Sequence, residues 1–414
     1  MKVVVVGSGG REHALAEAFA RHAHEVCVSP GNDGMPWSTA VPATDLAADL
    51  FVIGPEAPLI AGLADELRAQ GKVVFGPSQH AAQLEGSKVF MKQLLDAAGV
   101  PTASWKLAHA RLSRRRVTSM VNHFYLISRG CIVKTDGPAA GKGVAVFGTD
   151  LEHRFNAAQD AWRKLHDVEH NPSREVVIEE LLIGTEASLE AIVSGTDYVL
   201  LPGARDYKRL LDGDQGPNTG GMGGYSPHGS DEDVRMWAKV CLEPLLAELS
   251  QRGIDYRGAM KIDLMLTEAG PQVLEVNVRL GDPETQSIMP RITSDLAELL
   301  LAAARAQPLP TLEVSSYAAV TVVLTTSGYP ERATVGQVIA PSREVLTRVD
   351  ARHHIYCAGV RLDENGTDLL TSGGRVLAVT ALGGTRELAR ERAYARVRHI
   401  TWLGCQYRKD IAAD

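Results

Sequence analysis

Residues 261–286 read KIDLMLTEAGPQVLEVNVRLGDPETQ: two apolar strands, joined by a short turn and followed by a polar segment. Within this stretch Asp263, Glu275 and Asn277 interrupt the apolar pattern. Residues two apart on a strand share a face, and pairing across the turn brings Asp263 near Glu275. Carboxylate and amide oxygens suit Mg²⁺, with Mn²⁺ as a second candidate ion. The stretch therefore predicts a metal site with Arg279 on the same face. The alternative is a polar strand face without a ligand.

A second candidate site is a glycine-rich tip, residues 136–143 (DGPAAGKG), between the predicted strands Cys131–Thr135 and Val144–Phe147. Glycines let backbone N–H groups approach an anion, and Lys142 and Lys134 add positive charge. The tip is not a Walker A loop, because it joins two strands and lacks the GK[ST] ending. The tip predicts a lid, formed by Gly141, Lys142 and Gly143, that covers phosphates. A plain hairpin is an equal alternative.

Two further glycine-rich segments could bind anions. Residues 216–227 read GPNTGGMGGYSP, and five glycines in twelve residues predict a shaped loop rather than a helix or strand interior. Residues 7–13 read GSGGREH, a strand that turns through glycines into a helix, which is typical of an anion-binding helix N-terminus. Arg11 suits a phosphate there, whereas His13 is equally well explained as a helix-face residue with no role. A dinucleotide site is disfavoured because Glu12 replaces the last glycine of GxGxxG.

The chain of 414 residues is too long for one core and predicts an α/β protein of several domains. Near the N-terminus the strands Lys2–Val6, Asp49–Ile53 and Val73–Phe75 each end in a glycine turn and alternate with helical patterns. This alternation predicts a doubly wound parallel sheet. The last hundred residues are strand-rich, with one predicted helix at Arg386–His399. The predicted domains are 1–104, 105–186 (a lid subdomain), 187–315 (a central catalytic subdomain) and 316–414.

Composition excludes several classes of protein. Apolar residues make up 45% and charged residues 22%, as in soluble globular proteins, and no apolar run approaches the ~20 residues of a membrane span. The N-terminus reads as a first strand rather than a signal peptide. The net charge of −7 argues against nucleic acid as a partner. Five scattered cysteines without a CxxC pair indicate reduced thiols and a cytoplasmic protein.

Several segments, in order along the chain, resemble the phosphoribosylamine–glycine ligases (glycinamide ribonucleotide synthetases), ATP-grasp enzymes of purine synthesis. The most specific are the 216–227 loop and Gly281–Gln286. The others are Gly7–Leu15, Pro30–Asn32, Gly54–Leu59, Phe75–Pro77, Glu85–Lys88, Asp136–Gly137 with Ala139–Gly143, Glu179–Glu180, Ser294–Leu296, Gly373–Leu377 and Arg408–Ile411. The resemblance implies an ATP-grasp fold with a doubly wound N-terminal domain and a small strand-rich C-terminal domain.

The resemblance also implies residue roles, with ATP as cofactor. For ATP these are Lys88, Lys134 and Lys142 at the phosphates, Glu179 with the backbone of Glu180 and Leu182 at adenine, and Glu186 at the ribose. Glu275 and Asn277 ligate Mg²⁺, and Arg279 holds the reacting carboxylate or its acyl phosphate. With Arg279 and Lys142, Asp282 is a further expected catalytic residue. The acceptor site is expected at Asp206, Lys208, Asn218, Thr219, Gly220, Gly221, Met222, Pro283 and Glu284, with Gly10 and Arg11 near a sugar phosphate.

The implied reaction joins 5-phosphoribosylamine and glycine. ATP converts the carboxylate to an acyl phosphate, the amine attacks it, and an amide, ADP and phosphate result. The expected partners are small molecules, with no membrane, and the chain is expected to be a monomer or small homo-oligomer. A hypothesis of another class, a nucleotide-binding scaffold without catalysis, is disfavoured because a scaffold has no need of metal ligands.

Four departures from the family pattern predict an alternative. In the glycine-rich tip, Pro138 stands where the family has a leucine. The family's Ser-Gln-Asp-His-Lys-Arg reads ARDYKR at 204–209, and its Tyr-Ala-Gly-Leu-Met strand reads KIDLM at 261–265. The segment after Asn32 is also shorter than in the family. Because substitution of a few residues is enough to shift substrate specificity, these changes suggest a divergent ligase for a different small carboxylate and amine in a specialised pathway.

Overall fold

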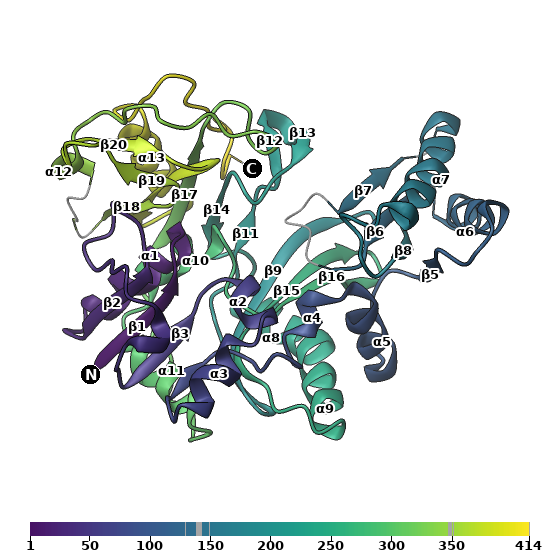
Figure 1. Cartoon of the computed structure of the whole chain (residues 1–414), viewed down its shortest axis with the longest axis horizontal. Helices are drawn as coiled ribbons and strands as arrows, with labels where there is room; N and C mark the ends of the chain where they lie inside the picture. Colours follow the sequence, from purple (N-terminus) through teal and green to yellow (C-terminus); the bar gives the residue numbers. More distant parts are fainter. Residues whose placement is uncertain (129, 138–142, 149, 347–349, 351, 414) are drawn as a thin grey trace.

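The computed structural model describes the whole chain except residues 129, 138–142, 149, 347–349, 351 and 414. Figure 1 shows an N-terminal sheet at the lower left, a strand-rich unit above it, a central sheet, and a smaller unit of strands and helices that projects to the right. No helix in the described part of the chain combines the length and the apolarity that a bilayer crossing requires.

The N-terminal unit is the predicted parallel sheet. Its strands β1 (Lys2–Gly7), β2 (Glu25–Pro30), β3 (Leu50–Ile53) and β4 (Val74–Phe75) lie in the order β2-β1-β3-β4, all parallel. β1 and β3 are apolar and buried throughout their centres, as expected for parallel strands covered on both faces. The helices are α1 (Gly10–Ala20), α2 (Glu56–Ile60) and α3 (Leu63–Ala69). Between β2 and β3 the only helical turn is Ala43–Asp45, so the short connection has no α-helix.

The projecting unit is an antiparallel sheet of order β5-β8-β6-β7, covered by α6 (Arg114–Ile127) and α7 (Leu151–His166). Its strands are β5 (Trp105–His109), β6 (Cys131–Thr135), β7 (Val144–Phe147) and β8 (Glu175–Glu180). The predicted hairpin β6–β7 is confirmed, because both strands have the predicted bounds and pair antiparallel. The glycine-rich tip between them lies mostly outside the described residues.

The central sheet has the order β10-β9-β15-β16. Its strands are β9 (Thr185–Ser194), β10 (Asp197–Leu200), β15 (Arg257–Thr267) and β16 (Gly270–Asn277). The predicted hairpin is confirmed, and Asp263 lies opposite Glu275 in the register. The apolar face of this sheet shares a core with α4 (Gln83–Gly86), α5 (Lys88–Ala98), α8 (Asp231–Trp237) and α9 (Glu243–Gln251). A π-helical turn, Ala238–Leu242, joins α8 and α9 into one continuous helical segment.

The C-terminal unit is a sheet of order β11-β14-β17-β21-β18 with α13 (Arg386–Val397) packed on it. Its strands are β11 (Arg205–Asp206), β14 (Gly223–Ser226), β17 (Ala318–Thr325), β18 (His353–Cys357) and β21 (Arg375–Gly383). Two hairpins lie beside it: β12 (Arg209–Leu211) with β13 (Gln215–Asn218), and β19 (Val360–Leu362) with β20 (Leu369–Thr371). The remaining helices are α10 (Glu284–Ile288), α11 (Leu296–Ala304) and α12 (Arg343–Leu346).

The prediction that residues 216–227 contain no strand is wrong. Residues Gly223–Ser226 form a buried strand between β11 and β17. A Cβ on Gly223 would lie 2.6 Å from the Thr321 carbonyl oxygen, and one on Gly224 would lie 2.7 Å from that of Arg205. Glycine is needed here because neighbouring backbone approaches closely, and this is a tertiary cause that local propensity does not report.

Candidate active site

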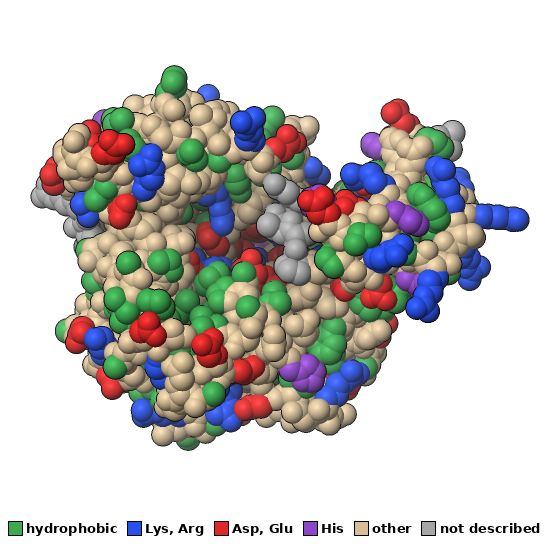
Figure 2. Space-filling model, viewed as in Figure 1, with side chains coloured by type: hydrophobic (Ala, Val, Ile, Leu, Met, Phe, Trp, Pro, Cys, Tyr) green, Lys and Arg blue, Asp and Glu red, His purple; other side chains and the backbone are tan. Residues whose placement is uncertain are grey.

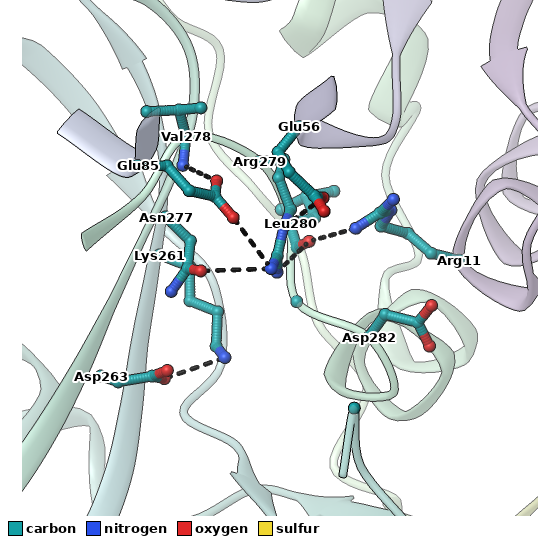
Figure 3. A network of polar contacts seen from close by, with 12 residues as sticks. Arg11, Glu56, Glu85, Lys261, Asp263, Asn277, Val278, Arg279, Leu280 and Asp282 are labelled. Atoms are coloured by element: carbon teal, nitrogen blue, oxygen red, sulfur yellow. Dashed lines mark hydrogen bonds and ion pairs between the residues drawn. The ribbon is translucent and has the colours of Figure 1, made fainter. Parts of the chain in front are cut away.

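One face of the central sheet is polar because charged residues alternate with apolar ones on three adjacent strands. The register aligns Glu190, Lys261 and Asn277 in one row across the sheet. The next row is Ser188, Asp263 and Glu275. The intervening residues, such as Leu189, Ile262 and Val276, are buried on the opposite face. The predicted approach of Asp263 to Glu275 therefore belongs to a wider polar face, which also carries Asn277 and Lys261. Figure 3 shows Lys261, Asp263 and Asn277.

Asp263 is held by two lysines. Lys261 Nζ lies 2.9 Å from Asp263 Oδ1, and Lys208 Nζ lies 3.0 Å from Asp263 Oδ2. Burial would raise the pKa of Asp263, but Lys208 and Lys261 outweigh it and hold the pKa well below its usual range. Both oxygens are therefore paired with cations. This arrangement favours a role for Asp263 in positioning the two lysines, rather than the metal-ligand role expected from the sequence.

Lys261 also reaches Glu284, at the start of α10, with Nζ 2.7 Å from Oε1. Ser188 Oγ lies 3.2 Å from that oxygen and from Asp263 Oδ1 and donates to both. Glu190 accepts from the Gly281 N–H at 3.1 Å through Oε2, whereas its buried Oε1 has no hydrogen-bond partner. Burial, with Glu284 nearby, raises the pKa of Glu190 to about 8. The polar face therefore carries more carboxyl groups than its two lysines balance.

Arg279 follows β16 and is flanked by acidic groups from α2 and α4. Its Nε lies 3.3 Å from Glu56 Oε2 and its Nη2 lies 3.1 Å from Glu85 Oε1. Nη2 also donates to Asn277 Oδ1 at 3.1 Å. Burial would lower the pKa of Arg279, but Glu85 and Glu56 raise it instead. The sequence did not predict that these two glutamates contact Arg279. They stood out only because they lie in segments that resemble the ligase family.

Two guanidinium groups meet beside this face. Arg11 Nη1 donates to the Leu280 carbonyl oxygen at 3.2 Å, and Arg279 Nη1 donates to the same atom at 3.3 Å (Figure 3). Arg11 Nε is also 2.6 Å from Glu12 Oε1, and Glu12 Oε2 accepts from the Gly9 N–H at 2.7 Å. The start of α1, with Gly10 and Arg11, therefore lies at the carboxyl end of β16. Glu12, which was not predicted, fixes this approach.

His13 makes a structural contact. Its Nδ1 accepts from the Cys357 N–H at 2.9 Å, and its ring packs edge-on against Trp37 and Tyr356. Burial lowers the pKa of His13 to about 4, against the opposing effect of Glu17. His13 therefore joins the N-terminal and C-terminal units as a neutral side chain, which supports the reading without a catalytic role.

The predicted adenine residue Glu179 lies between two buried lysines. Lys134 Nζ is 2.9 Å from Glu179 Oε2 and Lys92 Nζ is 3.2 Å from Oε1. Lys134 also donates to the Leu274 carbonyl oxygen at 3.1 Å, which links the projecting unit to β16. Burial lowers the pKa of Lys92 to about 8, although Glu179 opposes this effect. Lys92 was not predicted as a site residue. The feature that could have pointed to it is its charge among the apolar, buried positions of α5.

The first residues of the glycine-rich tip contact the start of α5. Lys88 Nζ donates to the Gly137 carbonyl oxygen at 3.0 Å, and Asp136 Oδ1 accepts from Ser87 Oγ at 3.0 Å. Burial lowers the pKa of Lys88, with Glu275 opposing. Gly143 is described, and its carbonyl oxygen accepts from Lys164 Nζ at 3.1 Å. The predicted Gly141 and Lys142 lie outside the described residues.

Other predicted nucleotide residues lie close to these contacts. Glu180 Oε1 accepts from the Ser104 N–H at 2.7 Å. Leu182 and Glu186, just before and within β9, are half-buried. Figure 2 shows the surface hollowed near its centre, with acidic and basic side chains at the bottom of the hollow.

The predicted acceptor segments are tied together by the C-terminal unit. Arg375 Nη2 lies 2.9 Å from Asp282 Oδ2, and its Nη1 donates to the carbonyl oxygens of Gly220 and Asp282. The Gly220 N–H in turn donates to the Tyr329 hydroxyl at 2.8 Å. Burial would raise the pKa of Asp282, but the nearby Arg375 outweighs this effect and holds the pKa below its usual range. Gly221 packs directly on Pro283.

The remaining acceptor residues surround Lys208. Thr219 Oγ1 and its N–H both donate to the Lys208 carbonyl oxygen, at 2.9 and 2.7 Å. Met222 is buried, and Asn218 is half-buried at the end of β13. Burial raises the pKa of Asp206 to about 7, against the effect of Lys208. The predicted site residues that the structure describes therefore gather around the polar face of the central sheet.

Family models for three consecutive domains match this chain in order. They are described as phosphoribosylglycinamide synthetase N domain, ATP-grasp (A) domain and C domain, and they match residues 1–85, 86–285 and 319–414. The chain belongs to the phosphoribosylglycinamide synthetase family.

Members of this family are similar to the chain over their full lengths. A protein from Leifsonia xyli subsp. xyli, named phosphoribosylamine–glycine ligase, is 41% identical over 433 aligned positions that cover 100% of both chains. One of the same name from Streptomyces coelicolor is 40% identical, covering 100% of this chain and 99% of its own. These alignments exceed the 414 residues of this chain, so the relatives have positions that it lacks.

Solved structures agree with the family assignment. The crystal structure of phosphoribosylamine–glycine ligase from Thermotoga maritima has a TM-score of 0.86 and 34% identity, and the match covers 99% of this chain and 100% of that one. A biotin carboxylase domain from Hydrogenobacter thermophilus, solved with MgADP and bicarbonate, has a TM-score of 0.72 at 13% identity, covering 98% and 91%. The second similarity shows the fold alone. The predicted ATP-grasp fold is confirmed.

The family's metal chemistry can be compared with the donors that this chain offers. Among the described residues, no three His, Cys, Asp or Glu side chains are placed to share a metal ion. Mg²⁺ needs less from a protein, because it commonly binds one or two carboxylates and completes its shell with phosphates and water. Glu275 and Asn277 supply adjacent oxygen donors on the polar face, and this donor set fits Mg²⁺ held jointly with a nucleotide.

Proposed function

We propose that this chain joins 5-phosphoribosylamine to glycine with ATP, giving glycinamide ribonucleotide, ADP and phosphate in purine biosynthesis. The observation that carries the proposal is the convergence of Arg279, the oxygen donors Glu275 and Asn277, and the lysine Lys134 at one end of β16. The full-length similarity to ligases of this name favours these substrates over the divergent pair that the sequence departures suggested.

The chemistry proceeds in two steps. A glycine carboxylate oxygen attacks the γ-phosphorus of ATP and ADP leaves, which turns a poor leaving group into phosphate. The amine nitrogen then attacks the acyl carbon, phosphate departs, and the nitrogen loses a proton. Phosphoryl transfer depends mainly on positioning and electrostatic stabilisation. Arg279, held in place by Glu56 and Glu85, is suited to orient the carboxylate and to stabilise the charge that develops on the acyl phosphate.

The nucleotide would lie between the projecting unit and β16. Lys88 and Lys134 would hold its phosphates, and Gly141, Lys142 and Gly143 are proposed to bind the same phosphates. Glu179, with the backbone of Glu180 and Leu182, would bind adenine, and Glu186 would bind the ribose hydroxyls. Glu275 and Asn277 would hold Mg²⁺, which neutralises phosphate charge during transfer. Asp263 would place Lys208 and Lys261 beside this site rather than bind the ion.

The acceptor would lie on the opposite side of Arg279. Arg11, at the start of α1 with Gly10, is suited to the sugar phosphate. Glu284, Asp206 and Lys208 would line the acceptor side. The segment Asn218–Met222, with Asp282 and Pro283, would shape it, because Arg375 fixes Gly220 to Asp282. The chain is further proposed to act in the cytoplasm, as a monomer or small homo-oligomer.

The direct test is ADP release with Mg·ATP, glycine and freshly generated phosphoribosylamine, against reactions that lack one component each. Turnover that requires all of them, with the amide product identified by mass, is the expected result. If ATP binds but this pair gives no turnover, the proposed substrates are wrong, and a panel of other amino acids and amines run in the same assay identifies the actual pair.

A further inference from the structure

The last residues of the chain lie against the hairpin β12–β13, and Arg408 forms the contact. Its guanidinium makes a two-pronged ion pair with Asp410, Nε to Oδ1 at 2.7 Å and Nη2 to Oδ2 at 2.6 Å. Nη1 reaches Asp214 Oδ1 at 2.7 Å and the Arg209 carbonyl oxygen at 3.1 Å. Arg408 is only 1% exposed, although it lies near the end of the chain. It is therefore a buried cation with hydrogen-bond partners in both the hairpin and the tail.

Backbone groups reinforce this contact from both sides. The Gly213 N–H donates to Asp410 Oδ2 at 2.8 Å, and the Lys409 N–H donates to Asp212 Oδ1 at 2.7 Å. The hairpin is otherwise exposed, and an isolated two-stranded hairpin is marginally stable at best in water. Its position therefore depends on the tail, which lies next to it in Figure 1.

Tyr207 carries the contact into the acceptor site. The Arg408 guanidinium lies 4.9 Å from the centre of the Tyr207 ring, and the Ala412 N–H donates to the Tyr207 hydroxyl at 3.0 Å. Tyr207 stands between Asp206 and Lys208 in the chain, and its carbonyl oxygen accepts from the Met222 N–H at 2.8 Å. The tail therefore holds the segment that presents Lys208 to the polar face.

We infer that Arg408 is a positioning residue for the acceptor site, acting through the β12–β13 hairpin and Tyr207 without touching a substrate. This inference rests on the proposed function only for the identity of the acceptor. The simpler explanation is that Arg408 anchors the tail and contributes to stability alone. The two explanations differ in whether losing Arg408 affects one substrate selectively.

The test combines Arg408→Met and Arg408→Lys with the control Lys409→Met. Lys keeps the charge but cannot form the two-pronged pair. Lys409 is the adjacent cation, and its side chain is exposed. For Arg408→Met the KM for phosphoribosylamine or glycine is expected to rise about 10- to 100-fold, because small displacements in a site have effects of this size. The KM for ATP and every constant of Lys409→Met are expected to stay within about twofold. Arg408→Lys is expected to fall between Arg408→Met and the wild type.

A structural measurement makes the inference independent of activity. In Arg408→Met, amide hydrogen exchange is expected to become faster in 209–222, while 175–180 in β8 keeps its wild-type rate. Equal rises in all KM values, or unchanged exchange in 209–222, would overturn the inference. If Arg408→Met does not fold, Asp214→Asn and Tyr207→Phe remove single contacts and must show the same selective effects. If the wild type gives no turnover with this pair, the proposed function fails. The exchange measurement alone then decides whether Arg408 holds residues 209–222 in position.

Discussion

The charge imbalance on the polar face makes the stability of this protein depend on pH through Glu190. The side chain is buried, its Oε1 has no hydrogen-bond partner, and Glu284 has a second unpartnered oxygen, Oε2. A Cβ on Gly281 would lie 2.5 Å from Glu284 Oε2 and 2.9 Å from Glu190 Oε1, so the two oxygens converge beneath that glycine. Glu190→Gln would retain an acceptor for the Gly281 N–H and would place an amide donor near Glu284.

The magnitude follows from linkage. Burial raises the pKa of Glu190 from 4.5 to about 8, with Glu284 adding to the effect. The folded chain then keeps a proton that the unfolded chain has lost, so wild-type stability falls as pH rises from about 4.5 through about 8. One pKa unit corresponds to about 1.4 kcal/mol, so the loss between pH 5.5 and pH 9 is roughly 3 kcal/mol. Gln at this position does not ionise and escapes this loss.

The assay is hydrogen exchange of peptides from β9 and β15 in the wild type and Glu190→Gln at each pH from 5.5 to 9. Comparing the two proteins at the same pH cancels the intrinsic exchange rate. The protection of the variant relative to the wild type is expected to grow roughly 100-fold across this range, which corresponds to about 3 kcal/mol. Glu268→Gln, in the exposed β15–β16 turn, is the control and should show no growth. A constant or shrinking difference for Glu190→Gln would refute the reasoning.

Three further substitutions test separate parts of the site. Glu275→Ala is expected to abolish ADP formation while leaving the far-ultraviolet circular dichroism spectrum unchanged, and retained turnover would remove Glu275 as a metal ligand. Arg11→Ala should raise the KM for the phosphorylated amine about tenfold with little effect on the KM for ATP, since one charged hydrogen bond contributes about 1.5 kcal/mol, and no effect would argue for an unphosphorylated amine. Lys92→Met should leave Glu179 without one of its two cations, so the KM for ATP should rise and the melting temperature should fall, consistent with the roughly 3 kcal/mol typical of breaking a buried pair. Binding of ATP equal to that of the wild type would show that Lys134 alone suffices.

The parts of the site that depend on local periodicity could be predicted from the sequence. Alternation on two strands placed Asp263 opposite Glu275, and the structure has that register. The N-terminal parallel sheet followed from apolar strands that end in glycine turns. Both predictions concern neighbours along one strand or across one short turn, for which the spacing of residue types contains the answer.

The partners of these residues could not be predicted, because they come from distant segments. Glu56 reaches Arg279 from α2 and Glu85 reaches it from α4, and Lys208 reaches Asp263 from the segment between β11 and β12. The strand at Gly223–Ser226 was missed for the same reason, since glycine is required there by the approach of the Thr321 and Arg205 carbonyl oxygens. Propensity and spacing report what a segment can do alone, and tertiary contacts decided these three cases.

The arrangement of charges also explains why this site draws on separate units of the chain. A buried arginine or lysine is costly unless it is paired and hydrogen-bonded. The N-terminal unit supplies Glu56 to Arg279, α5 beneath the central sheet supplies Lys92 to Glu179 of the projecting unit, and the C-terminal unit supplies Arg375 to Asp282. Each pair is intact only when two units are docked correctly. The groups proposed to meet phosphate and carboxylate are therefore held in position before substrates arrive, and preorganised charge of this kind is what phosphoryl transfer requires from a protein.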